Sequence, residues 1–270
     1  FMFVFSFIGG LISPYEQDKF FYADKTIRRE FAAVIKNTEF RYSSADDSVF
    51  GLPAQAQAMQ AIQQQKDGFT YRDNRFTLTK EAAKEKLGVN DGRPLIVSFW
   101  GSLGASGMNA QMADMLALEA GKEPFHHIHG AGKSGYAAVL KALAEKGVDL
   151  KDHPSLQVRE YIYDMAPVMR AADLVICRAG ASTVSELTAL AVPAVIVPSP
   201  YVTNNHQEKN ARILEKHGGA RVILEKDATG EALYRAAGEI LRSPELRRSM
   251  SAGMAELGIP DATERIYRTG

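Results

Sequence analysis

A short turn between an apolar run and a hydroxyl-rich stretch carries the residues best suited to chemistry. Residues 174–177 have the composition of a buried strand, and a helix is predicted to begin near Ala181. The first backbone N–H groups of a helix have no partners within the helix, and the helix dipole attracts negative charge there. Ser182 and Thr183 add hydroxyl groups at the same place. The stretch therefore predicts a phosphate-binding turn.

Glu186, one helical turn further on, has two interpretations. Its carboxylate can accept hydrogen bonds from two neighbouring hydroxyls, as on a ribose. Thr183 and Glu186 also have the spacing of a capping box, in which the carboxylate only satisfies the backbone of its own helix. These residues alone leave both interpretations open.

A proline-stiffened loop at 198–211 is rich in polar side chains. Asn204, Asn205, His206 and Gln207 follow two prolines and lead into a predicted helix. Amide groups both donate and accept hydrogen bonds, which suits recognition of a polyhydroxylated sugar. A capped polar surface loop is the alternative.

Two glycine-containing loops follow other apolar runs. GSLGA at 101–105 lacks the dinucleotide-binding G-x-G-x-x-G spacing, but small residues entering a helix suit phosphate; a tight turn without a ligand is the alternative. Residues 129–134 (HGAGKS) resemble a P-loop, yet His127 stands where the first motif glycine belongs. No ATPase is predicted.

Three histidines lie close together at His126, His127 and His129. On a strand only the last two share a face, and no cysteine or carboxylate is adjacent in sequence, so packed or hydrogen-bonded histidines are favoured over a metal site. The chain also has no Asp-x-Asp pair that would hold a divalent ion against a diphosphate. We therefore expect no metal and no cofactor. The single cysteine, Cys177, is expected to be a buried structural thiol.

Composition excludes several functional classes. Lys+Arg and Asp+Glu both number 32, so the net charge is zero and nucleic-acid binding is not expected. A hydrophobic fraction of 46% over 270 residues is typical of a soluble globular protein. One cysteine excludes a disulfide framework.

The chain after residue 90 alternates apolar runs with helical spacing. Strand candidates are 95–99, 125–129, 157–162, 174–177, 194–197 and 221–224, and segments such as 108–120 and 135–146 are predicted helices. Continuous apolar strands between helices predict an α/β fold with a Rossmann-like, doubly wound parallel sheet. Ligands of such sheets bind beyond the carboxyl ends of the strands.

The first 90 residues show a weaker pattern. The apolar run at 1–12 is too short for a membrane span and has no basic start, so a core strand is favoured over membrane-surface contact. The Gln- and Ala-rich stretch at 54–65 and the charged stretch at 80–87 are predicted helices, the second ending at Gly88.

Four segments together resemble the MurG family of glycosyltransferases, which add N-acetylglucosamine to the lipid-linked muramyl-pentapeptide of peptidoglycan synthesis. They are GSLGA (101–105), YIYDM (161–165), CRAGASTVSE (177–186) and PSPYVTNNHQEKNA (198–211). The resemblance covers residues 79–270. It implies a GT-B fold with a donor-binding domain at 91–270, and an incomplete or degenerate acceptor-side remnant and linker at 1–90.

The resemblance also implies roles for individual residues. Ser102 and Gly104 correspond to the diphosphate-binding loop, and Ala181, Ser182 and Thr183 to the phosphate turn. Ile162 corresponds to the residue whose backbone contacts uracil, with Met165 packing nearby. Glu186 corresponds to the ribose ligand, and Gln207 to the amide that orients the sugar hydroxyls, assisted by His206 and Arg178. Arg75 matches only part of a motif.

The activity implied is metal-independent, inverting transfer from UDP-N-acetylglucosamine to an undecaprenyl-linked acceptor (lipid I to lipid II). That activity places the protein in the cytoplasm, peripheral on the inner face of the plasma membrane. The first 78 residues lack the family's histidine-bearing glycine turn, so the sequence assigns no general base or acceptor site. One alternative is a donor-binding subunit or fragment that needs a missing N-terminal domain or partner chain; another is a sugar-nucleotide epimerase.

Overall fold

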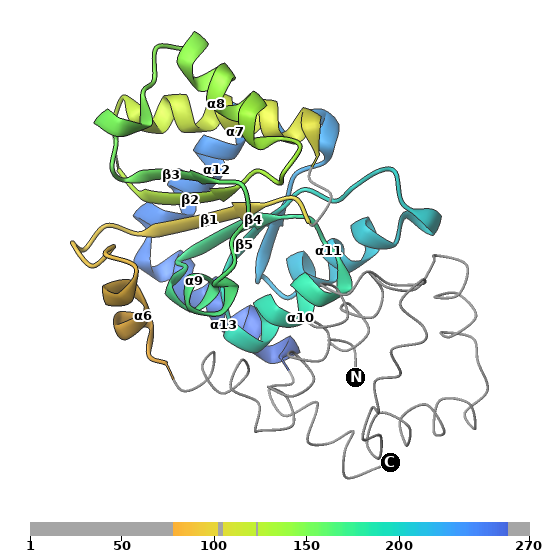
Figure 1. The fold of residues 1–270 in the computed structure, drawn as a ribbon. Coiled ribbons are helices and arrows are strands. Elements are labelled where there is room, and N and C mark those ends of the chain that lie inside the picture. The colour runs from red at the N-terminus through yellow and green to blue at the C-terminus, as the bar shows by residue number, and fades with distance from the viewer. Residues whose placement is uncertain (1–77, 102–104, 123, 259–270) are drawn as a thin grey trace, which may run out of the picture. The chain divides into compact units, whose positions relative to one another are not determined.

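A computed structural model describes residues 78–101, 105–122 and 124–258 of the chain (Figure 1). The predictions for the apolar run at 1–12, the helix at 54–65, and Arg75, Ser102 and Gly104 lie outside the described residues.

The fold is built on a six-stranded parallel sheet with the strand order β3-β2-β1-β4-β5-β6. The strands are β1 (Leu95–Phe99), β2 (His126–Gly130), β3 (Leu156–Arg159), β4 (Leu174–Cys177), β5 (Ala194–Ile196) and β6 (Ala220–Val222). Every residue of β4 is buried, as expected for a strand covered on both faces. The predicted doubly wound α/β fold is confirmed.

Helices cover both faces of this sheet. They are α6 (Lys80–Lys86), α7 (Ser106–Ala120), α8 (Tyr136–Glu145), α9 (Met165–Ala171), α10 (Ala181–Leu190), α11 (His206–Lys216), α12 (Gly230–Arg242) and α13 (Pro244–Leu257), with short 3-10 turns η1 (Leu150–Asp152), η2 (Thr203–Asn205) and η3 (Glu225–Asp227). In Figure 1, α7, α8 and α12 lie on one face, and α6, α9 and α10 lie on the other.

The core has one apolar layer on each side of the sheet. Side chains alternate along a strand, so Ile96 joins the layer under α7 and α12, while Leu95 and Val97 join the layer under α9 and α10. All three side chains are fully buried. Burial on both faces explains why β4 and β5 are continuously apolar.

An ion-pair cluster attaches α6 to the sheet. The carboxylate of Asp173 lies 2.7 Å from Nζ of Lys80 and 2.5 Å from Nζ of Lys84, and it accepts a 2.9 Å hydrogen bond from the backbone N–H of Leu95. Although burial disfavours the charged form, the two lysines hold the pKa of Asp173 below its ordinary value. The predicted helix end is confirmed, because Gly88 follows α6 with a φ of +68°.

The strand order reverses direction between β1 and β4, which are neighbours in the middle of the sheet. Phe99 pairs with Cys177, so the loop after β1 and the turn after β4 leave the sheet side by side. Open α/β sheets bind ligands in the crevice at this point. Within the described ranges, no helix is long and apolar enough to cross a bilayer.

Candidate functional site

The turn after β4 has the geometry of an anion site. Helix α10 begins at Ala181 after an extended N-cap residue, Gly180, which supplies no side-chain hydrogen bond to the helix. Val184 is the first residue whose N–H bonds back, to the carbonyl of Gly180 at 2.9 Å. The N–H groups from Ala181 to Thr183 precede that bond and therefore have no carbonyl of their own helix to bind.

The same geometry tests one of the two interpretations of Glu186. A capping box would need Thr183 as the N-cap residue, but Thr183 lies inside α10, whose N-cap is Gly180. The capping-box interpretation is therefore wrong. Glu186 is partly exposed, and its charge acts on the Cys177 thiol at the end of β4.

Cys177 is fully buried, as predicted for a structural thiol. Burial raises the pKa of this thiol well above its ordinary value, and the nearby carboxylate of Glu186 raises it further. A thiol held in its protonated form is a poor nucleophile. Cys177 therefore serves packing at the base of the turn.

Arg178, directly after β4, is 8% exposed and is bound within the protein. Its Nη1 donates to the backbone carbonyl of Val197 at 3.0 Å and lies 2.6 Å from Oε2 of Glu225. Its guanidinium also lies over the ring of Trp100, 5.8 Å from the ring centroid. These partners come from the ends of three other strands.

The amide-rich loop leads into α11 through left-handed backbone at Asn204 and Asn205. Oε1 of Gln207 accepts a 3.0 Å hydrogen bond from the N–H of Ser199, which leaves the amide nitrogen as the donating end of this side chain. Nδ2 of Asn210 donates to the carbonyl of Ala179 at 3.2 Å. Helix α11 is thereby joined to the turn before α10.

The loop between β3 and α9 combines buried and exposed side chains. Ile162 is 4% exposed and packs in the layer under α9, and Met165 begins α9 against the same layer. Tyr161 and Tyr163 are exposed, with ring centroids 5.3 Å apart. His206, at the start of α11, is also exposed.

The predicted hydrogen-bonded histidines are confirmed. Ser98 Oγ lies 2.7 Å from Nε2 of His127 and 2.8 Å from Nδ1 of His129, so these two histidines share one face as expected. His127 also forms a hydrogen bond with the carboxylate of Glu119, which lies eight residues earlier in the sequence. Across the described ranges, no three His, Cys, Asp or Glu side chains are grouped so that they could hold a metal ion.

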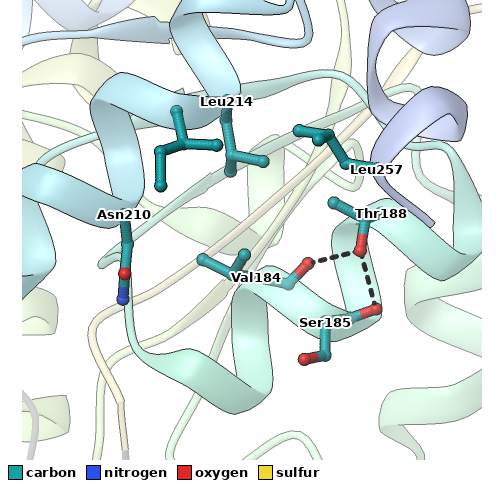
Figure 2. Close-up of a pocket in the computed structure, with 7 residues that line it drawn as sticks. Val184, Ser185, Thr188, Asn210, Leu214 and Leu257 are labelled. Carbon is teal, nitrogen blue, oxygen red and sulfur yellow. Dashed lines mark hydrogen bonds between the residues drawn. The ribbon is translucent and has the colours of Figure 1, made fainter. Parts of the chain in front are cut away.

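A separate pocket of about 190 Å³ lies between α10, α11 and the end of α13 (Figure 2). Two of its lining hydroxyls are already used: Oγ of Ser185 donates to the carbonyl of Ala181, and Oγ1 of Thr188 donates to that of Val184. None of the residues predicted from the sequence to bind a ligand lines this pocket.

Sequence reasoning missed three residues at the carboxyl edge: Trp100, Asn210 and Glu225. Trp100 is the only tryptophan of the chain and directly follows β1, and Glu225 begins η3 shortly after β6. The rule that ligands lie beyond strand ends would have drawn attention to both. The sequence singles out the loop at 198–211 that contains Asn210, but it does not predict the bond of Asn210 to Ala179, which spans 31 residues.

The whole described sheet lies in a part of the chain that matches a known protein family. Residues 95–266 match the family described as glycosyltransferase family 28 C-terminal domain. The chain belongs to this family. The match includes β1 to β6 and both turns at the switch point.

Relatives in this family extend the resemblance. The chain is 42% identical over 200 residues to the UDP-N-acetylglucosamine–N-acetylmuramyl-(pentapeptide) pyrophosphoryl-undecaprenol N-acetylglucosamine transferase of Acetivibrio thermocellus, covering 74% of this chain and 53% of the relative. The enzyme of the same name from Caldanaerobacter subterraneus is 40% identical over 201 residues, covering 74% and 54%.

A solved structure agrees with these relatives. Acinetobacter baumannii MurG superposes with a TM-score of 0.56 at 30% identity, covering 65% of this chain and 51% of that one. The resemblance to the MurG family is thus confirmed. The chain spans about half the length of the curated relatives it matches.

Proposed function

We propose that the chain carries the donor site of a transferase that moves N-acetylglucosamine from UDP-N-acetylglucosamine to a lipid-linked muramyl-pentapeptide. One observation supports this most strongly: the unsatisfied start of α10 lies at the switch point of a family 28 domain. In this proposal residues 91–270 bind the donor. Residues 1–90 belong to the acceptor side and the linker. Helix α6, which lies in the linker, packs against α9.

The N–H groups from Ala181 to Thr183 bind the diphosphate. Negative charge grows on the leaving UDP as the bond to the sugar breaks, and preorganised donors stabilise that charge. The hydroxyls of Ser182 and Thr183 and the helix dipole add to this stabilisation. Ser102 and Gly104 on the neighbouring loop contact the same group.

Four more of the predicted residues hold the nucleoside and the sugar. Glu186 accepts hydrogen bonds from the ribose hydroxyls, and the backbone of Ile162, with Met165 beside it, contacts the uracil. Gln207 has its oxygen engaged by Ser199, so it donates from its amide nitrogen to a sugar hydroxyl.

The acceptor hydroxyl attacks the anomeric carbon directly, which inverts its configuration. A general base must remove the proton from this hydroxyl. A polyprenyl-linked acceptor lies in a membrane, so the enzyme works at a membrane surface, which we assign to the cytoplasmic, inner face of the plasma membrane.

Calorimetry with UDP and a turnover assay with UDP-N-acetylglucosamine and lipid acceptor test the proposal. Binding of UDP together with UDP release that requires the acceptor supports the transferase. UDP binding without turnover assigns the chain to donor binding alone. Conversion of the donor without any acceptor would indicate an epimerase, and no UDP binding contradicts the proposal.

A further inference from the structure

Arg178 lies where the ends of four adjacent strands meet. It directly follows β4, and its partners Trp100, Val197 and Glu225 follow β1, β5 and β6. These four strands are neighbours in the order β1-β4-β5-β6. One buried guanidinium therefore connects the segments that follow four of the six strands, on both sides of the switch point.

The charge of Arg178 is already compensated. Its Nη1 lies 2.6 Å from the carboxylate of Glu225, and only 10% of its side chain is exposed. A charge paired at this distance has little net attraction left for a second anion. Glu225 is 24% exposed by its side chain and also lines a pocket with Gly107 and Met108 at the start of α7. A carboxylate in that place would repel a diphosphate that approached Arg178 directly.

The turn after Arg178 is held from its other side as well. Ala179 is fully buried, and its carbonyl accepts the hydrogen bond from Nδ2 of Asn210. Gly180 and the start of α10 follow immediately. The side chain of Arg178 and the amide of Asn210 thus fix the backbone that aims the first N–H groups of α10.

We propose that Arg178 and Glu225 form a positioning pair that orients the anion-binding turn at Gly180–Thr183, and that Arg178 does not itself contact the donor. The inference rests on the proposed function, because it assigns a consequence for nucleotide binding to the pair. It changes the role of Arg178 from assisting the sugar contact to fixing the protein backbone.

The two roles of Arg178 predict opposite changes of UDP affinity for one substitution. Glu225→Gln removes a negative charge near the diphosphate, so direct contact by Arg178 would leave UDP affinity unchanged or increase it. A positioning pair predicts the opposite, because Arg178 loses the partner that holds it. We expect Glu225→Gln and Arg178→Gln each to weaken UDP binding about tenfold. The double variant should be no weaker than the weaker single variant, since either change breaks the same pair.

Calorimetric titration of the full chain with UDP, performed well below the Tm of each variant, tests this. The exposed pair of Arg221 and Glu239 provides the matched control, so Arg221→Gln should leave UDP affinity unchanged. Unchanged or tighter UDP binding in Glu225→Gln overturns the positioning pair, as does a lower Tm without an affinity change. If Arg178→Gln does not fold, Glu225→Gln still decides. Absence of UDP binding by the wild-type chain would instead overturn the proposed function.

Discussion

Nδ1 of His127 lies 2.8 Å from Oε2 of Glu119, and neither side chain has any solvent exposure. The pair joins the last turn of α7 to the start of β2, at the amino end of that strand. A buried carboxylate is costly unless it is paired and hydrogen-bonded. The location of the proton between these two groups therefore determines whether this part of the core holds an ion pair or two neutral groups.

The direction of the surrounding hydrogen bonds follows from one amide. Nδ2 of Asn109 donates to the carbonyl of Ala131 at 2.8 Å, so its Oδ1 accepts from Nε2 of His129 at 3.2 Å. Nδ1 of His129 then accepts from the hydroxyl of Ser98. The Ser98 oxygen in turn accepts from Nε2–H of His127. The direction of each hydrogen bond in this chain fixes the direction of the next one.

Nitrogen-15 NMR of the histidine rings should therefore find His129 neutral with its proton on Nε2, and His127 with a proton on Nε2. Slow exchange of both protons with water is expected, because both rings are fully buried. His217, whose side chain is 38% exposed, should exchange rapidly and serves as the internal control. A proton on Nδ1 of His129 would contradict the hydrogen-bond direction.

The pH dependence of the free energy of unfolding should reflect the protonation of His129. Burial, assisted by the nearby His127, lowers the pKa of His129 from 6.5 to about 3. As the pH falls below 6.5, this side chain takes up a proton in the unfolded chain but stays neutral in the native protein. The free energy of unfolding should then fall by about 1.4 kcal/mol per pH unit from this group, until the pH nears its native pKa.

Urea denaturation of the wild-type chain and of His129→Gln from neutral to mildly acidic pH measures this slope. The variant should be less stable at neutral pH but show a flatter pH dependence. Asp173 has a lowered pKa, so its contribution is lost only below its ordinary value of 3.8 and leaves this window unaffected. Equal slopes in the two proteins would show that His129 does not carry the effect.

Glu186→Ala should weaken UDP binding by about 1–3 kcal/mol, because a charged hydrogen-bond acceptor for the ribose is lost. Isothermal calorimetry measures the affinity, and a thermal melt shows whether the fold is retained. Ser185→Ala is the matched control on the same helix, since the Ser185 hydroxyl bonds the carbonyl of Ala181 within α10. An unchanged UDP affinity with a lowered Tm would leave Glu186 a structural residue.

Gly135→Ala should destabilise the fold by about 1–3 kcal/mol through overpacking. A Cβ at Gly135 would overlap Nδ2 of Asn109 and lie 2.6 Å from the carbonyl oxygen of Ala131. Gly107→Ala is the control, because a Cβ at Gly107 meets no atom within 4 Å. Urea unfolding of both variants tests this, and equal stability of the two would refute the tight fit around Asn109.

Sequence pattern predicted the fold well because the strands are buried on both faces. The runs at 95–99 and 174–177 match β1 and β4 residue for residue. The edges of the sheet were predicted less closely. The expected strand at 157–162 is β3 at Leu156–Arg159, because Ile162 is buried in the loop that follows the strand.

The candidate site was predictable only where local sequence encodes it. The turn at Gly180–Thr183 could be inferred because a strand, small residues and a helix follow one another. The ion pair between Arg178 and Glu225 joins residues separated by β5, α11 and β6, so only the folded sheet brings the two together. The same holds for Glu119 and His127, which the turn between α7 and β2 makes neighbours.

A crystal structure of the chain with UDP would test the donor site most directly. The proposed site predicts diphosphate oxygens within hydrogen-bonding distance of the backbone N–H groups of Ala181, Ser182 and Thr183, with the ribose hydroxyls at Glu186. A diphosphate bound away from the start of α10, for example in the pocket of Figure 2, would contradict it.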